Sequence, residues 1–412
     1  MQPPIRSLPR RALWTFVDQG LSSVSNAALS IVVARSVNPT AFGSFAIAVL
    51  VFTFVIGTSR AMITDPLVIR FSTADDHDHR GASGRAATAA MSLGTVTGLA
   101  CVFAGLIAGI GGDLGAALIC LGVLLPGLLV QDAWRYVFFS RGDPLRATII
   151  DLTWAVVQFG IIAVLLFVGK GTMVTLMLSW GVGAVVAAVL GGILQKQRLS
   201  ATGGLGWLRE NRHLSWRLGA DFVVNQGAGT TAVALVGPVS SVSAVGALSA
   251  ARTLLGPLQL LFSGTTSFVL PVFAGSVASR RLRRQAALTS LCLVTAAGVW
   301  VLAMVQLPTE WGIWLLRENW AGAAAVIPAL GWSMIMIAGA VGAGLGLKAR
   351  SEAQLLLKVT LLQAPLLLGL GALGGWLNGA PGAALAFAAV QTLGFAITWW
   401  AFLSTDKRHV RD

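Results

Sequence analysis

The chain has 412 residues, of which 56% are hydrophobic and only 11% charged, and its formal net charge is +13. Its mean hydropathy of +0.79 lies above the usual range of soluble domains and excludes a soluble globular protein. We therefore predict an all-α polytopic membrane protein, because a helix of roughly 20 apolar residues satisfies its own backbone groups across a hydrocarbon core of about 30 Å.

Apolar runs of spanning length recur along the whole chain and predict about twelve transmembrane helices. An even number of spans places both termini on one side of the membrane. The first run carries Asp18 and Gln19 and leads into further spans, so we expect it to remain as a helix and not to be removed as a signal peptide. The predicted spans cover residues 12–34, 41–62, 86–110, 113–139, 147–169, 172–194, 216–238, 244–275, 286–307, 323–347, 355–375 and 380–403.

The basic residues indicate the orientation, because Lys and Arg in short loops accumulate on the cytoplasmic side. Most of the 29 Lys and Arg residues fall in the segments that this arrangement assigns to the inside, Arg135 among them. The outside loops hold only Arg35, Lys170 and Arg317, and Arg252 lies within a span. The distribution predicts cytoplasmic N and C termini and explains the positive charge without a nucleic-acid partner.

A basic segment divides the predicted spans into two sets of six. We predict an N-terminal six-helix bundle at 1–194, a basic cytoplasmic linker at 195–215 and a C-terminal six-helix bundle at 216–412. Because six spans separate the two sets, both have the same orientation in the membrane.

The two sets open in a similar way. Asp18 and Gln19 lie early in the first span, and Asp221, Asn225 and Gln226 lie at matching depth in the seventh. This pattern predicts two bundles related by a parallel pseudo-two-fold repeat. Parallel repeats are typical of transporters, whose substrate site lies at the interface between the repeats.

Three segments carry a family pattern: Asp18-Gln19 running into "ARSVNPTAFGSFAIAV", "DPLVIRF" at 65–71 and "SAVGALSAARTLLGPLQLLFSGTTSFVLPVFA" at 243–274. They resemble the bacterial polysaccharide-transporter (Wzx-type) flippases of the multidrug/oligosaccharidyl-lipid/polysaccharide exporter superfamily. The resemblance implies a multi-pass protein of the bacterial plasma (inner) membrane. It also implies a substrate, a polyprenyl-diphosphate-linked oligosaccharide that is turned between the leaflets by alternating access.

Polar side chains inside the first and seventh spans are the main candidates for a substrate cavity, since an ionisable group at mid-bilayer costs roughly 2.5 to 3.5 kcal/mol. In one interpretation they line the cavity as a proton or cation site, or as partners for sugar hydroxyls. In the other they lie near the interface, pair with local arginines or join helices by hydrogen bonds. The candidates are Asp18, Gln19, Asn26, Asp221, Asn225 and Gln226.

Arg252 is the candidate for binding the diphosphate. It lies within the eighth span, shortly before Pro257, which is expected to kink the helix. A guanidinium in a wet cavity binds a diphosphate in a bidentate geometry that Lys does not offer. The alternative is an ion pair with Asp221, or a side chain that reaches the interface.

Arg60 and Asp65, at the cytoplasmic end of the second span, are candidates for a gate pair, with a structural interface pair as the alternative. The run "DDHDH" at 75–79 is interpreted as a solvated loop and not as a metal site. The sequence carries no nucleophile–base set, phosphate loop or metal-ligand spacing. We therefore expect no enzymatic activity, no catalytic residue, no metal and no cofactor, with transport coupled to H⁺, Na⁺ or the membrane potential.

The leading functional prediction is a flippase for envelope polysaccharide synthesis. The expected partners are membrane lipid, the lipid-linked glycan and, in addition, glycosyltransferases or a polymerase, and the expected state is a monomer. The alternatives are a cation-coupled drug or metabolite antiporter of the same superfamily and a scaffold that transports nothing. Arg252 separates the first two, because a cation exporter would tolerate its loss.

Overall fold

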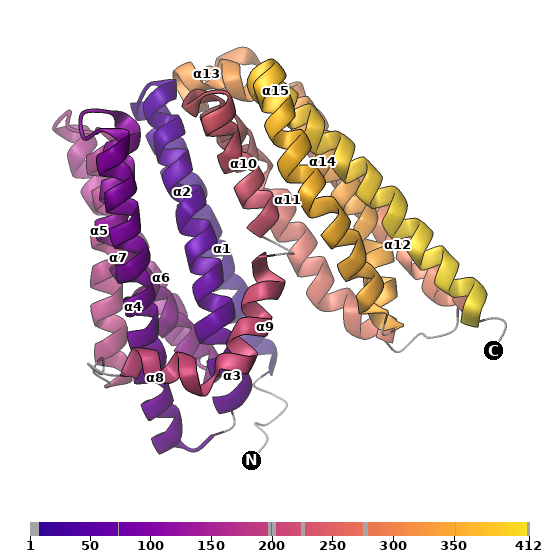
Figure 1. Ribbon diagram of the computed structural model, residues 1–412, viewed down its shortest axis with the longest axis horizontal. Helices are drawn as coiled ribbons and strands as arrows, with labels where there is room; N and C mark the ends of the chain where they lie inside the picture. The colour runs from indigo at the N-terminus through magenta and orange to yellow at the C-terminus, as the bar shows by residue number, and fades with distance from the viewer. Residues whose placement is uncertain are drawn as a thin grey trace. The chain divides into compact units, whose positions relative to one another are not determined.

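A computed structural model describes residues 8–409 except 73, 197, 198, 200–202, 224–226, 275–278 and 351. Every element in these residues is helical (Figure 1), which agrees with the predicted all-α class. Of the described helices, nine are long and apolar enough to cross a membrane. The chain is therefore a multi-pass membrane protein, while the total of twelve spans and the two-fold repeat stay predictions.

The chain divides into two compact units, which we call unit 1 (Met1–Val37 with Ile47–Val223) and unit 2 (Asn38–Ala46 with Val224–Asp412). From the N-terminus to the end of unit 1 the elements are α1 (Leu8–Ser36), α2 (Pro39–Ser59), η2 (Arg60–Thr64), α3 (Asp65–Phe71), α4 (Asp76–Ala108), α5 (Asp113–Ser140), α6 (Pro144–Phe167), α7 (Met173–Gln195), α8 (Gly203–Glu210) and α9 (Arg212–Phe222).

Unit 2 contains the remaining helices. They are α10 (Ala228–Val239), α11 (Val242–Ala274), α12 (Ser279–Val305), α13 (Thr309–Leu316), η4 (Arg317–Asn319), α14 (Trp320–Ala349) and α15 (Ala353–His409). The last of these is two helices joined at a kink, because Asn378 and Gly379 have non-helical backbone angles. Gly379 has a φ of 59°, which a residue without a Cβ adopts at little cost.

The described part of the predicted linker is largely helical and belongs to unit 1. Helices α8 and α9 contact α4, η2 and α3, and α8 crosses α4 (Figure 1). Trp207 of α8 is fully buried, with its ring 5.7 Å from that of Phe71. Arg85 donates to both carboxylate oxygens of Glu210 at 2.8 Å. These contacts hold α8 and α9 against the other helices of unit 1. The predicted bundle boundaries stay predictions.

The start of α4 departs from the predicted solvated loop at 75–79. Asp75 caps the helix by accepting a hydrogen bond from the Asp78 amide at 2.8 Å. His79 is fully buried one turn later, and its Nε2 lies 2.7 Å from the Ser140 hydroxyl. The residues that suggested a metal-like loop therefore form a helix start. Among the described residues, no group of three His, Cys, Asp or Glu side chains could hold a metal ion.

Glycines allow α4 and α5 to approach closely. A Cβ on Gly98 would collide with the carbonyl oxygen of Gly122, and a Cβ on Gly122 would lie 2.5 Å from the carbonyl oxygen of Gly98. Small residues at such contacts are typical of helices in lipid, where packing replaces the hydrophobic driving force.

Gly98→Ala is therefore expected to destabilise the protein by about 1 to 3 kcal/mol through overpacking. Gly81→Ala is the control on the same helix, because a Cβ there meets nothing within 4 Å and removes a glycine from a helix. Thermal unfolding in detergent measures both variants. Equal melting temperatures for the two would contradict the close approach of α4 and α5.

Candidate functional site

Five ionisable side chains from four elements meet inside unit 1. They form what we call the charge cluster: Asp18 of α1, Arg60 of η2, Asp132 and Arg135 of α5, and Asp151 of α6. Four of them are nearly inaccessible to solvent, with exposures of 0% for Asp18, 3% for Asp132, 4% for Arg135 and 5% for Asp151. Buried charges need partners, since an isolated ion inside a protein is very costly.

Arg135 lies between two carboxylates. Its Nε and Nη2 both donate to Asp18 Oδ2, the Nε bond being 2.9 Å long. The same Nε lies 3.1 Å from Asp151 Oδ2, whose other oxygen accepts a 2.7 Å hydrogen bond from Gln131. Asp18 thus pairs with an arginine, but the partner is a buried residue of α5. Arg135 lies within α5, where the predicted span 113–139 places it, and its burial in this pairing shows that it is wrongly included among the basic residues of the inside segments.

Arg60 forms a second, bidentate pair with Asp132. Its Nε and Nη2 donate to the two carboxylate oxygens at 2.9 and 2.6 Å, and its guanidinium lies 5.3 Å from the centre of the Tyr136 ring. Arg60 begins η2, a π-helical turn between α2 and α3, and such turns are frequent at functional sites. The partner of Arg60 is therefore Asp132 and not the predicted Asp65. A role of Arg60 and Asp65 in gating stays a prediction.

The cluster contains more acids than bases. Asp18, Asp132 and Asp151 face Arg60 and Arg135, so full ionisation would leave one excess negative charge. Asp18 Oδ1 is buried and has no hydrogen-bond partner in the described part of the chain. Chemically, such an arrangement can accept a proton.

A small space lies beside the cluster. Its volume is about 10 Å³, close to the minimum for one water molecule. Gln158 is buried there, and its Nε2 has no partner among the described residues. The other lining residues are Ser22, Ser25, Asn26, Asp151, Trp154 and Ala155.

Arg252 lies in unit 2, on α11. It is half-buried, and its neighbours Ala251 and Leu255 are almost fully buried. Within the described residues of unit 2, its guanidinium has no hydrogen bond and no ion pair. Its donors are therefore available to an anion, and an ion pair with Asp221 stays a prediction.

Comparisons with known proteins agree on the fold. A multidrug resistance MATE family transporter of the MOP superfamily, in its inward-facing conformation, shares 12% identity over 94% of this chain and 95% of its own, with a TM-score of 0.70. The lipid II flippase MurJ, in an inward closed conformation, shares 11% identity over 94% of this chain and 87% of its own, with a TM-score of 0.74. The chain has the MOP-superfamily fold.

A further structure with the MOP fold is a transporter from Pyrococcus furiosus described as having a binding pocket of reverse polarity. It shares 11% identity over 97% of this chain and 95% of its own, with a TM-score of 0.57. No protein-family model and no curated protein matches the sequence. At this identity the likeness extends to the fold alone, and this fold agrees with the superfamily named by the sequence resemblance.

The polar candidates of the first and seventh predicted spans lie in different surroundings. Asp18 joins the charge cluster, Asn26 is exposed but lines the small space beside it, and Gln19 is exposed. Asp221 is exposed on α9, whereas Asn225 and Gln226 lie outside the described residues.

Sequence reasoning missed the α5 and α6 members of the cluster. Gln131, Asp132 and Arg135 interrupt an otherwise apolar run at a spacing of one helical turn, which is a signal that could have been read. Asp151, near the start of the predicted span 147–169, is buried against Arg135.

Proposed function

We propose that this chain is a flippase that moves a polyprenyl-diphosphate-linked oligosaccharide across the bacterial plasma membrane by alternating access. The observation that carries the proposal is Arg252, whose guanidinium is half-buried in an apolar helix and has no partner in unit 2 as described. A diphosphate suits such a group, because two of its N–H donors match two phosphate oxygens. The MOP fold supports the proposal at the level of architecture.

Coupling to a cation is proposed to drive the cycle, with the charge cluster as its site. The excess carboxylate and the unpartnered Asp18 oxygen favour the binding of H⁺ or Na⁺. The inside-negative potential would assist export of an anionic headgroup by about 2.3 kcal/mol per charge per 100 mV.

A cation-coupled drug or metabolite antiporter is the second candidate. The observation that favours it is the same acid-rich cluster, since an antiporter needs a cation site but no diphosphate site. In that case Arg252 would contribute to helix packing or to the orientation of the helix in the membrane. The two candidates therefore differ in whether Arg252 binds the substrate.

The proposed setting follows from the basic residues and the resemblance. We place the protein in the bacterial inner membrane with cytoplasmic termini, acting as a monomer. Glycosyltransferases or a polymerase are the proposed partners, because they would supply and consume a lipid-linked glycan.

Reconstitution in liposomes tests the function. A polyprenyl-diphosphate-linked oligosaccharide with a fluorescent headgroup is placed in both leaflets, and a membrane-impermeant quencher is added outside. Without flipping, roughly half of the signal is quenched, whereas a flippase exposes nearly all of it. Quenching that stays at half, together with gradient-driven uptake of a cationic dye, would favour the antiporter.

A further inference from the structure

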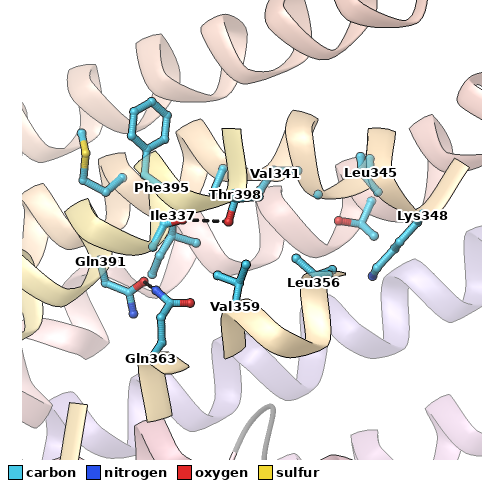
Figure 2. A pocket seen from close by; sticks show the side chains of 15 residues that line it. Ile337, Val341, Leu345, Lys348, Leu356, Val359, Gln363, Gln391, Phe395 and Thr398 are labelled. Atoms are coloured by element: carbon cyan, nitrogen blue, oxygen red, sulfur yellow. Dashed lines mark hydrogen bonds between the residues drawn. The ribbon is translucent and has the colours of Figure 1, made fainter. Parts of the chain in front are cut away.

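A cavity of about 260 Å³ lies within unit 2, between α14 and the two halves of α15. Figure 2 shows apolar side chains along its walls. They include Ile337, Val341 and Leu345 from α14 and Leu356 and Val359 from α15. A lining of this kind excludes strongly polar solutes and favours hydrocarbon.

The two ends of the cavity differ in chemistry. Gln363 and Gln391 lie at one end and Lys348 lies at the other (Figure 2). The Gln363 amide nitrogen is 3.5 Å from both the Gln391 side-chain oxygen and the Val390 carbonyl oxygen. The Gln363 amide therefore already has acceptors within the protein.

Lys348 remains available at its end. Its side chain is exposed, and the described residues offer it no hydrogen bond and no ion pair. Arg350, two positions further on, is different, since it is buried and donates to the Thr405 hydroxyl at 2.9 Å and to the Phe402 carbonyl at 3.1 Å. Arg350 thus has a structural role, whereas Lys348 can attract an anion at the mouth of the cavity.

Gly344 keeps the cavity open. A Cβ at this position would meet only Leu356 Cδ1, at 3.8 Å, so the missing side chain leaves space between α14 and α15. The stretch of α14 from Met336 to Lys348 lines the cavity and is about 18 Å long at 1.5 Å per residue. The result is a long, narrow space with one cationic end.

We propose that this cavity binds one hydrocarbon chain of an anionic phospholipid, with the phosphate of the headgroup at Lys348. The volume is below the range of about 300 to 1,000 Å³ that is usual for small-molecule pockets, which fits a single unbranched chain. The cationic end lies near the end of α14, at the side that the basic residues assign to the cytoplasm, where anionic lipids are enriched. The lipid proposed here is distinct from the glycan substrate, whose proposed binding residue is Arg252.

Photo-crosslinking of the whole protein in nanodiscs tests the site. The probes are phosphatidylglycerol and phosphatidylcholine that carry a photoreactive group in the acyl chain, and mass spectrometry maps the labelled peptides. We expect labelling of α14 and α15 peptides that line the cavity, about fivefold stronger with phosphatidylglycerol, the equivalent of about 1 kcal/mol for one basic residue. Lys348→Gln should lower phosphatidylglycerol labelling to the phosphatidylcholine level.

Lys358→Gln is the matched control, because Lys358 is exposed on α15 but does not line the cavity. Gly344→Leu should abolish labelling by both lipids, with its folding checked by thermal unfolding. Equal labelling by the two lipids that neither Lys348→Gln nor Gly344→Leu changes would overturn the proposal. Displacement of the label by an equimolar polyprenyl monophosphate would also overturn it, because the occupant would then be a prenyl chain.

Discussion

Arg252→Ala is expected to lower glycan translocation roughly 10- to 100-fold, because hydrogen bonds to a charged group contribute about 1.5 to 3 kcal/mol each. The guanidinium has no partner in the described part of unit 2, so its removal leaves no other buried charge of that unit unpaired. Arg252→Lys should recover only part of the activity, since an ammonium does not reproduce the bidentate geometry. The liposome quenching experiment measures all three proteins.

The control for this substitution is Arg283→Ala. Arg283 is exposed near the start of α12, and its loss should leave translocation unchanged. Normal translocation by Arg252→Ala would remove the diphosphate site from the proposed function. Unchanged dye transport in the same variant would then favour the antiporter.

Arg135→Met is expected to destabilise the protein by about 3 to 5 kcal/mol, because it leaves Asp18 and Asp151 buried without their shared cation. Neutralising all three positions, with Asp18→Asn and Asp151→Asn added, should restore most of the stability, since no uncompensated charge remains. Thermal unfolding in detergent measures both variants. The pair of a half-buried Arg141 and an exposed Asp76 is the control, and Arg141→Ala should cost less than about 1 kcal/mol.

The neutralised triple variant also separates structure from coupling. A folded triple variant should have lost the response of transport to a pH or Na⁺ gradient, because the proposed cation site is gone. If its transport still follows the gradient, the cluster is structural and coupling lies elsewhere. If Arg135→Met is as stable as the natural protein, the paired geometry of the cluster is wrong.

Hydropathy alone determined that the chain is helical and crosses the membrane many times. The physical reason is local, because each span satisfies its backbone hydrogen bonds within about 20 consecutive residues. The polar residues inside the spans were equally visible in the sequence, since each one interrupts an apolar run. Asp18 is a candidate on this ground alone, without reference to a partner.

Only the tertiary structure decided the partners. Arg60 pairs with Asp132, 72 positions away, and not with the nearby Asp65. Arg135 is buried between α1 and α6, although it was included among the basic residues of the inside segments. Such pairs depend on the depth and rotation of each helix relative to its neighbours, and packing between helices sets both. A linear pattern of hydropathy contains neither quantity, so the charges could be found in the sequence but their pairing could not.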